Sequence, residues 1–350
     1  MGMELFFYNL KGISRILLPR SIFRANCARK IDAIFKDFDD KTLDAIAKRV
    51  AYYHKINEPF TLIKPATQSE QKTRLGLFEP HFANLGYNNA LSFRKHYSTG
   101  YWYDSLKYTR YFDDALVWCY EFGDVNWYFP QPTITKTRPI NSLANASADN
   151  SVLLKLNQNR HFAFVKDRLD FKDKKDMLVF RGGCYWGNRV EFLKRYFFHP
   201  KCDIAHTGNP QVNSEFVKPK MSKKAQLNYK FILSLEGNDV ASNLKWIMNS
   251  NSLCIMPKPC YESWFMEANL IAGVHYAELN DSYDNLNELL EYYTSHEKEA
   301  QEIIHNAHAF VQNFKNDKVE DACNLLVLRK YFYLSGQIDI TPNEKALLRV

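Results

Sequence analysis

Between residues 177 and 279, short apolar segments alternate with amphipathic ones, and this alternation constrains the fold more than any other feature of the chain. The amphipathic segments NRVEFLKRYFF, NLKWIMNS and SWFMEANLIAG have helical spacing. The apolar segments that alternate with them are MLVFRGG, KCDIAHTG, YKFILSLEG, SLCIMP and VHYAEL. Because short strands that alternate with helices form βαβ units, the sequence predicts a parallel, Rossmann-like α/β sheet here.

The length of 350 residues predicts two domains, each large enough to bury its own core. An apolar run, ALVWCYEF, predicts a strand near residue 118, and the Pro-, Thr- and Asn-rich segment after it marks a boundary. Two long helices, broken near His296, and a last helix over about 317–334 follow the α/β region. We therefore predict an N-terminal domain (1–155), a C-terminal ligand-binding domain (156–315) and a C-terminal helical segment that packs back (316–350).

The composition is that of a globular protein that stays in the cytoplasm. Hydrophobic residues make up 46% of the chain, which excludes disordered and fibrous classes. Seven scattered cysteines form no CxxC pair and indicate free thiols in a reducing compartment. We find no secretion signal and no apolar run of about 18 residues that would span a bilayer. The sequon Asn145-Ala146-Ser147 is therefore read as chance.

The net charge of +7 is concentrated near the N-terminus. Residues 11–36 hold seven bases, interleaved with apolar residues that recur at helical spacing. One interpretation is a basic amphipathic segment that lies on an anionic membrane surface. The other is a helix packed on the first domain with its charged face in water. A nucleic-acid-binding module is a third reading of the charge, but the chain carries no such motif and we expect no nucleic acid partner.

Three predicted strand ends carry polar residues, and ligands of parallel sheets bind at that edge. Glycines there allow close backbone approach, arginines can bind phosphate oxygens, and a helix start favours a diphosphate. An acid at such an end can accept hydrogen bonds from sugar hydroxyls, with Trp264 as an apolar wall. The candidate residues for binding a nucleotide-type ligand are Arg181, Gly182, Gly183, Arg189, Gly237, Asn238, Asp239, Ser242, Asn243, Lys245 and Glu262. Taken singly, each has a plain structural explanation, as a turn, a cap or a dipole partner.

Several familiar motifs are absent or misplaced. The pattern is neither GxGxxG nor GxxxxGK[ST], which disfavours a dinucleotide dehydrogenase and a P-loop NTPase. The Asp37-Phe38-Asp39 triplet follows a helix-like segment, so we assign it to a helix-end turn and not to a metal site. His305 and His308 are more simply polar residues of a helix than metal ligands, and we expect no metal.

The segments FRGGCYWGNR and KFILSLEGNDVASNLKWIMNSNSLCIMPKPCYESWFMEANLIAGVHYAEL resemble the core of glycosyltransferase family 90. That family includes bacterial lipopolysaccharide-core transferases, capsule xylosyltransferases and protein O-glucosyltransferases. The resemblance covers about residues 110–310 and is greatest to the lipopolysaccharide branch. It implies a two-domain GT-B fold with two Rossmann-like domains, a UDP-sugar donor, inversion at the anomeric carbon and no metal or other cofactor.

The resemblance also suggests roles for single residues. The eukaryotic branch has an arginine where this chain has Asn243, so we assign the diphosphate contact to Arg189 and Lys245 instead. Its catalytic aspartate follows an apolar strand and shortly precedes a proline, a setting that Asp124 occupies in VWCYEFGDVNWYFPQP. A carboxylate can take the proton of the acceptor hydroxyl. The nearby competitors for this role are Asp104, Asp113 and Asp114.

Lys136 and Arg138 are candidate contacts for a phosphorylated acceptor, with a solvated, charge-balancing role as the alternative. The sequence thus predicts a metal-independent, inverting hexosyltransferase. It would move glucose or galactose from a UDP-sugar to a saccharide or glycolipid acceptor such as the lipopolysaccharide core, peripherally on the inner face of the cytoplasmic membrane. The alternatives are a capsule or protein glycosyltransferase that uses another donor such as UDP-xylose, and a non-catalytic binding protein.

Overall fold

The computed structural model describes residues 2–64, 77–85, 99–144 and 146–350. The chain divides into two compact units. Unit 1 contains Met1–Asn159, Glu262–Trp264 and Asn316–Val350, and unit 2 contains Arg160–Tyr261 and Phe265–Lys315. The chain therefore leaves unit 2 for three residues after Tyr261, and its last 35 residues belong with the N-terminal part.

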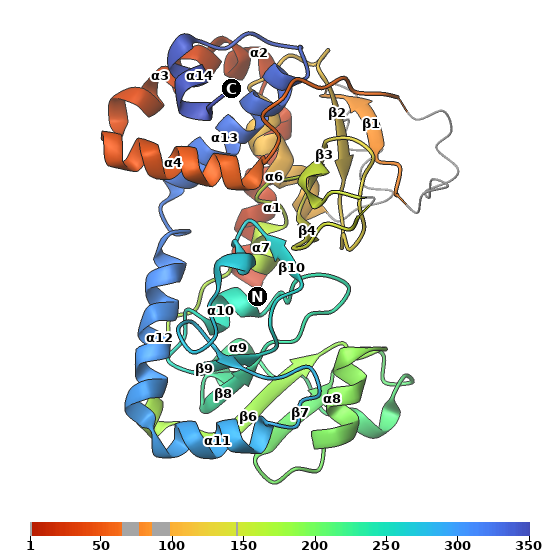
Figure 1. Ribbon diagram of the computed structural model, residues 1–350, viewed down its shortest axis with the longest axis vertical. Coiled ribbons are helices and arrows are strands. Elements are labelled where there is room, and N and C mark those ends of the chain that lie inside the picture. Colours follow the sequence, from red (N-terminus) through yellow and green to blue (C-terminus); the bar gives the residue numbers. More distant parts are fainter. Residues whose placement is uncertain (1, 65–76, 86–98, 145) are drawn as a thin grey trace. The chain divides into compact units, whose positions relative to one another are not determined.

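Unit 2 is built on a five-stranded sheet in the order β11-β9-β8-β6-β7, with every neighbouring pair parallel. The predicted parallel α/β sheet is thus confirmed (Figure 1). Its order reverses between β6 and β8, because the chain passes from β6 to β7 on one side and then crosses to β8 on the other. Such a switch point is where open parallel sheets bind ligands. The strands are β6 (Lys175–Gly182), β7 (Cys202–His206), β8 (Tyr229–Leu233), β9 (Leu253–Met256) and β11 (Ala277–Glu278).

Three helices pack on one face of this sheet, α8 (Asn188–Tyr196), α11 (Leu286–Ser295) and α12 (Glu297–Gln312). Their apolar residues share one core cluster with alternate residues of the strands, such as Leu178, Phe231 and Ile255. The intervening residues, Val179 and Ile232 among them, are buried on the opposite face. Burial on both faces is typical of parallel sheets and explains why their strands read as continuous apolar runs. The break near His296 lies between α11 and α12, as predicted.

Two predicted helices of unit 2 differ in the structure. The NLKWIMNS segment forms only the four-residue α10 (Leu244–Ile247). The SWFMEANLIAG segment is not an α-helix. Its first residue, Ser263, ends the strand β10 (Tyr261–Ser263), Met266 has a left-handed backbone (φ 58°), and only a 3-10 turn follows at Glu267–Asn269. The short helix α9 (Lys223–Gln226) also lies in unit 2, and α7 (Gln158–His161) spans the boundary at which unit 1 ends and unit 2 begins.

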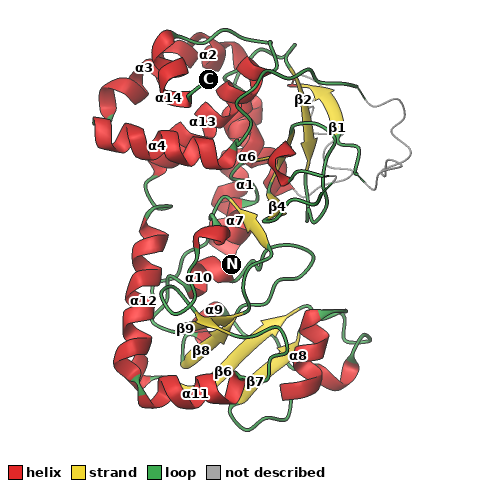
Figure 2. Ribbon diagram, viewed as in Figure 1, coloured by secondary structure: helices red, strands yellow, loops and turns green. Residues whose placement is uncertain are grey.

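Unit 1 combines a helical layer with a small sheet (Figure 2). Its helices are α1 (Gly2–Leu17), α2 (Arg20–Ala25), α3 (Cys27–Asp37), α4 (Asp40–Tyr53), α6 (Thr99–Thr109), α13 (Asp317–Leu334) and α14 (Pro342–Leu348). The predicted C-terminal helix is α13, which is almost entirely buried. The Asp37-Phe38-Asp39 triplet joins α3 to α4, and Asp39 caps α4 by accepting from the Thr42 N–H (2.8 Å), as the turn assignment predicted.

The sheet of unit 1 has the order β1-β2-β3-β5, formed by β1 (His81–Asn84), β2 (Val117–Glu121), β3 (Thr133–Thr135) and β5 (Ser151–Leu153). β1 is antiparallel to β2, whereas the other neighbours are parallel. No α-helix lies among the described residues between β2 and β3 or between β3 and β5. This mixed sheet departs from the second Rossmann-like domain that the sequence predicted. β4 (Thr137–Pro139) pairs with β10 in a separate two-stranded sheet.

Part of the basic N-terminal segment, residues 11–36, packs against the rest of unit 1. Ile31 and Ile34 on α3 are buried, so this part of the segment packs on the domain. Arg20 forms an ion pair with Asp114, and Arg24 pairs with Asp113 and Asp114. Across the described ranges, no helix is long and apolar enough to cross a membrane.

Candidate functional site

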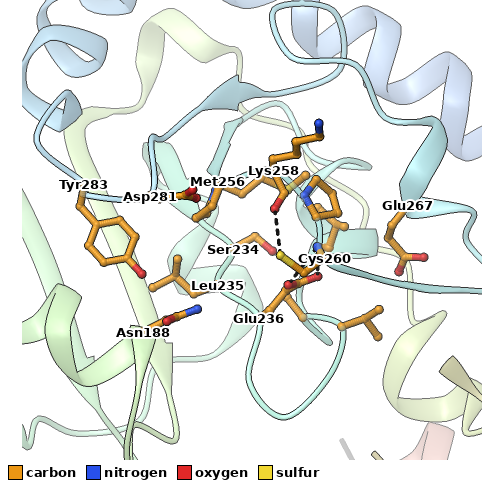
Figure 3. Close-up of a pocket in the computed structure, with 15 residues that line it drawn as sticks. Asn188, Ser234, Leu235, Glu236, Met256, Lys258, Cys260, Glu267, Asp281 and Tyr283 are labelled. Atoms are coloured by element: carbon orange, nitrogen blue, oxygen red, sulfur yellow. Dashed lines mark hydrogen bonds between the residues drawn. The ribbon is translucent and has the colours of Figure 1, made fainter. Parts of the chain in front are cut away.

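The carboxyl edge of the unit 2 sheet encloses a cavity of about 270 Å³. Residues that follow β8 and β9 form most of its wall, and Asn188 at the start of α8 contributes from the β6 side. Figure 3 shows Ser234 and Glu236 near its centre, with Tyr283 on one side and Glu267 on the other. The lining residues are Asn188, Ser234, Leu235, Glu236, Val240, Ala241, Leu244, Met256, Pro257, Lys258, Pro259, Cys260, Glu267, Asp281 and Tyr283.

Glu236 is the acid at the end of β8, and it is held by backbone groups alone among the described residues. Its carboxylate accepts the N–H groups of Cys260 (3.2 Å) and Tyr261 (3.1 Å). Burial raises the pKa of Glu236 to about 7, and those two N–H groups oppose the rise. An acid in this state accepts or donates a hydrogen bond near neutral pH, which suits a hydroxyl-bearing ligand.

Lys245 and Glu267 form a buried ion pair at the base of this region. Lys245 Nζ lies 2.5 Å from Glu267 Oε1, and both side chains are almost fully buried. The positive charge of Lys245 is therefore matched by a carboxylate, instead of standing open for the predicted diphosphate contact. Asn243 donates to the Leu233 carbonyl (2.9 Å) and accepts from the Ser234 hydroxyl (3.2 Å), so it fixes the end of β8.

Arg189 joins the loops that follow β6 and β8, the two strands at the switch point. Its guanidinium donates to the carbonyls of Gly183 (3.0 Å) and Leu235 (2.8 Å). A Cβ atom at Gly237 would lie 3.2 Å from the Arg189 guanidinium, so a glycine at 237 leaves room for this arginine. In this structure Arg189 positions the two loops beside the cavity, and its phosphate contact stays a prediction.

The other residues predicted at the β6 end have structural roles of their own. Arg181 pairs with Asp203 (2.7 Å) and donates to its carbonyl (2.6 Å), which directs it toward β7. A Cβ at Gly182 would meet the Phe180 ring at 2.7 Å, and one at Gly183 would meet the Tyr185 ring at 2.9 Å. The close approach of these two rings therefore explains why both positions are glycine, with no need for a ligand.

The turn after β8 is compact. The Gly237 N–H donates to the Asp239 carbonyl (3.1 Å), with Asn238 exposed at its tip and Ser242 half-buried just before α10. Because α10 has a single turn, it provides little of the dipole on which the predicted diphosphate site rested. None of the eleven predicted donor residues lines the cavity itself, although Arg189, Gly237 and Lys245 contact or adjoin residues that do.

Glu262 lies in unit 1 and belongs to β10, so it is not part of the unit 2 sheet to which the sequence assigned it. Its carboxylate accepts from Arg138 Nε (2.7 Å) and from the Tyr52 hydroxyl. Arg138 also donates to the carbonyls of Tyr52 (2.8 Å) and Ser151 (3.1 Å), and it is 0% exposed. Trp264, predicted as a wall of the ligand site, stacks on Tyr53 in the same unit. These contacts give Arg138 and Glu262 a structural role and lend no support to their predicted ligand contacts.

Asp124 lies in the loop after β2, three residues beyond the strand. Its carboxylate pairs with Lys136 Nζ at 3.0 Å and keeps 37% of its side chain exposed, whereas the Lys136 side chain is 3% exposed. Lys136 therefore holds Asp124 in place and is not presented to an acceptor. Among the competitors, Asp104 is buried on α6 and accepts the Gln158 N–H, and Asp113 and Asp114 pair with arginines.

The two histidines line a second, wider cavity of unit 2, of about 450 Å³. His308 Nε2 lies 2.8 Å from the Ser250 carbonyl, a contact typical of a structural histidine. Throughout the parts of the chain that the structure describes, no group of three His, Cys, Asp or Glu residues is arranged to hold a metal ion.

Sequence reasoning missed Glu236, Lys258 and Asp281, which line the cavity. Glu236 immediately precedes Gly237 at a predicted strand end, and that position was the signal that could have identified it. Lys258 follows β9 by two residues and Asp281 follows β11 by three.

A parallel sheet with a polar cavity at the carboxyl end of its strands defines unit 2 as a Rossmann-like ligand-binding domain. The sequence profile described as Glycosyl transferase family 90 matches residues 153–341, more than half of the chain. The chain is also 36% identical over 318 residues to the O-glucosyltransferase LpsA of Dichelobacter nodosus, covering 91% of this chain and 92% of that protein. The chain therefore belongs to glycosyltransferase family 90, and it is a glycosyltransferase.

Proposed function

We propose that the protein transfers a hexose, glucose or galactose, from a UDP-sugar to a saccharide acceptor of the lipopolysaccharide or lipooligosaccharide core. The name of the Dichelobacter nodosus relative, O-glucosyltransferase LpsA, supports glucose as the first donor to test. We further propose a GT-B arrangement in which unit 2 binds the donor and unit 1 the acceptor. The reaction would run peripherally at the inner face of the cytoplasmic membrane, without a metal ion or other cofactor.

The observation that carries this proposal is the cavity at the carboxyl edge of unit 2. Glu236, Ser234 and Asp281 supply hydrogen-bond acceptors there, which suit the hydroxyls of a ribose or hexose. Carboxylates repel a diphosphate, so we assign the cavity to a hydroxyl-bearing part of the donor. The exposed Lys258, together with Arg189 and the 237–243 turn beside the cavity, is our candidate for the diphosphate contact.

The chemistry assigned to unit 1 is that of a general base. Asp124 would take the proton of the acceptor hydroxyl as its oxygen attacks the anomeric carbon, and the bond to the UDP oxygen breaks on the opposite face, which inverts the configuration. Lys136 would keep the carboxylate oriented, because its buried ammonium reaches Asp124 from within the unit. Asp113 is the competitor to test, since its side chain is the most exposed of the three alternatives.

The test combines donor binding with transfer. Thermal shift against UDP-glucose, UDP-galactose, UDP-xylose, GDP and CMP, with and without EDTA, identifies the donor. Release of UDP with a core saccharide acceptor then measures transfer, and NMR of the product gives the anomeric configuration. We expect Asp124→Asn to keep donor binding and to lower kcat about 10²- to 10⁴-fold, and Asp113→Asn to do neither.

Other results would change the assignment. A response to UDP-xylose alone, or transfer to a protein acceptor, would favour the alternative branches of the family. Donor binding without transfer to any saccharide would favour a non-catalytic binding protein. If no UDP compound stabilises the protein, the donor proposal is wrong.

A further inference from the structure

Helix α1 presents an apolar stripe to solvent on the side opposite to the one that contacts α6. Phe6, Leu10, Ile13 and Leu17 recur at intervals of four, three and four residues, which places them on one helix face. They are 62%, 50%, 43% and 77% exposed. The exposed Leu18 and Ile22 extend the patch toward α2. We call these six residues the α1 stripe.

The opposite face of α1 is fixed to α6. Tyr8 donates to the Gly100 carbonyl (3.0 Å), and Arg15 donates to the Tyr103 carbonyl (3.2 Å). Gly12 is buried between them, where a Cβ atom would lie 2.3 Å from the Tyr103 ring. Because these three residues anchor the helix, the α1 stripe is a fixed surface of unit 1. Apolar patches of this kind mark sites of protein or membrane interaction.

We propose that the α1 stripe inserts into the interface of an anionic lipid membrane, with α1 lying in the membrane plane. At 16 residues, α1 is shorter than the roughly 20 residues that a spanning helix needs. A helix with Phe and Leu on one face and basic residues beside it is typical of interfacial binding. This inference deepens the proposed function, which places the reaction at the inner face of the cytoplasmic membrane, and it rests on that function for its biological meaning.

The exposed bases of the N-terminal segment that contains α1 favour lipid over a second copy of the chain. Lys11 is exposed on α1, and Arg29 and Lys36 are exposed on α3 of the same segment. Anionic headgroups attract such residues, whereas a symmetric dimer through this surface would bring like charges together. The inference also corrects the expected membrane segment, residues 11–36. Ile31 and Ile34 are buried and Arg20 and Arg24 are paired with aspartates, so the exposed apolar residues lie mainly before residue 20.

The experiment is co-sedimentation of the full-length protein with vesicles of phosphatidylcholine, alone or with phosphatidylglycerol. We expect the wild type to sediment with the mixed vesicles and Leu10→Asp to bind about ten-fold more weakly or worse. The matched control is Leu143→Asp, the same substitution at a leucine of similar exposure (57%) in a loop of unit 1. It should bind like the wild type. Added salt should weaken binding only in part, because insertion of the α1 stripe does not depend on charge.

Three outcomes would overturn the proposal. One is a wild type that sediments with neither kind of vesicle. Another is equal binding by Leu10→Asp and Leu143→Asp. The third is a wild type that does not bind vesicles but forms a dimer in light scattering, if Leu10→Asp dissociates that dimer. A second copy of the chain would then cover the α1 stripe. Transfer to a soluble acceptor separates this inference from the proposed function. If transfer persists in Leu10→Asp while vesicle binding is absent even in the wild type, only the membrane inference fails.

Discussion

Two glutamates have contrasting surroundings. Glu262 in unit 1 is part of a buried network of paired side chains, whereas Glu236 in unit 2 faces a cavity. Glu262 is 1% exposed and has a full set of partners, Arg138 and the Tyr52 hydroxyl. Glu236 faces a cavity and, among the described residues, has only two backbone N–H partners. A buried acid with a paired cation is stabilised in its charged form, whereas one without a cation is not.

The surroundings of Glu262 repeat this closed pattern. Glu320 on α13 pairs with Arg49 (2.6 Å) and Lys155 (2.7 Å) and accepts from the Trp264 indole (2.7 Å). Tyr53 donates to the Trp264 carbonyl (2.9 Å). These contacts hold residues 262–264 within unit 1, although the chain on either side belongs to unit 2. Of these two glutamates, the one with a matched cation therefore belongs to a structural network, and the one without a cation faces the cavity.

The largest effect that tests this comparison is expected from Arg138→Met. The change would leave the Glu262 carboxylate buried without its cation, and such a loss costs about 3–5 kcal/mol. Urea unfolding followed by tryptophan fluorescence measures it. The double variant Arg138→Met/Glu262→Gln should recover part of the loss, because no unpaired charge remains. A single-variant loss below about 1 kcal/mol would show that the network is not closed as described.

A smaller effect, with a pH dependence, is expected from Glu236→Gln. The pKa of Glu236 is raised from its ordinary 4.5 to about 7 in the folded protein, so folding favours the protonated acid. The stability that this acid contributes is complete below about pH 4.5 and is lost as the pH rises through 7. Glutamine mimics the neutral acid, so the variant should be more stable than the wild type by about 1–3 kcal/mol at pH 8 and little different at pH 5.

Thermal unfolding at pH 5 and pH 8 gives this difference, and the exposed Glu215→Gln is the matched control. The UDP-sugar that the thermal-shift screen identifies as the donor should stabilise Glu236→Gln less than it stabilises the wild type. The reason is that one hydroxyl of the ligand loses its charged hydrogen-bond acceptor. Equal pH profiles for wild type and variant would break the comparison, since Glu236 would then be no different from a paired acid.

The strands of unit 2 were predictable from the sequence, because burial on both faces makes each strand a short apolar run between polar turns. Helix α13 was predictable for a related reason, as its length gives a clear beginning and end. The 263–273 segment was not predictable, since its helical spacing is overridden by long-range contacts. Glu262 binds Arg138, 124 residues earlier, and Trp264 stacks on Tyr53. Local periodicity carries no information about such partners.

The same limit applies to the candidate site. The sequence placed ligand binding at the loops after β6, β8 and β9, and the cavity lies among these loops. The side chains that face the cavity differ from those predicted, because Lys245 is drawn to Glu267 and Arg181 to Asp203. An ion pair between residues about 20 positions apart is decided by how strands and turns meet in three dimensions. Elements are therefore predicted better than the orientation of single charged residues.

The smallest effect on stability is expected from a helix cap that lies outside both the network around Glu262 and the cavity that Glu236 faces. Asn316 is the first residue of unit 1 after unit 2 ends, and its side chain caps α13 by accepting from the N–H groups of Lys318 (3.1 Å) and Val319 (3.3 Å). Replacing such a cap by alanine costs about 1 kcal/mol. Asn316→Ala should therefore lower the urea midpoint slightly, and Gln312→Ala, at an exposed position on the last turn of α12, should leave it within about 0.5 kcal/mol. A loss in Asn316→Ala as large as that of Arg138→Met would mean that the network around Glu320 depends on how α13 begins, and the two regions would then differ in connectivity as well as in charge pairing.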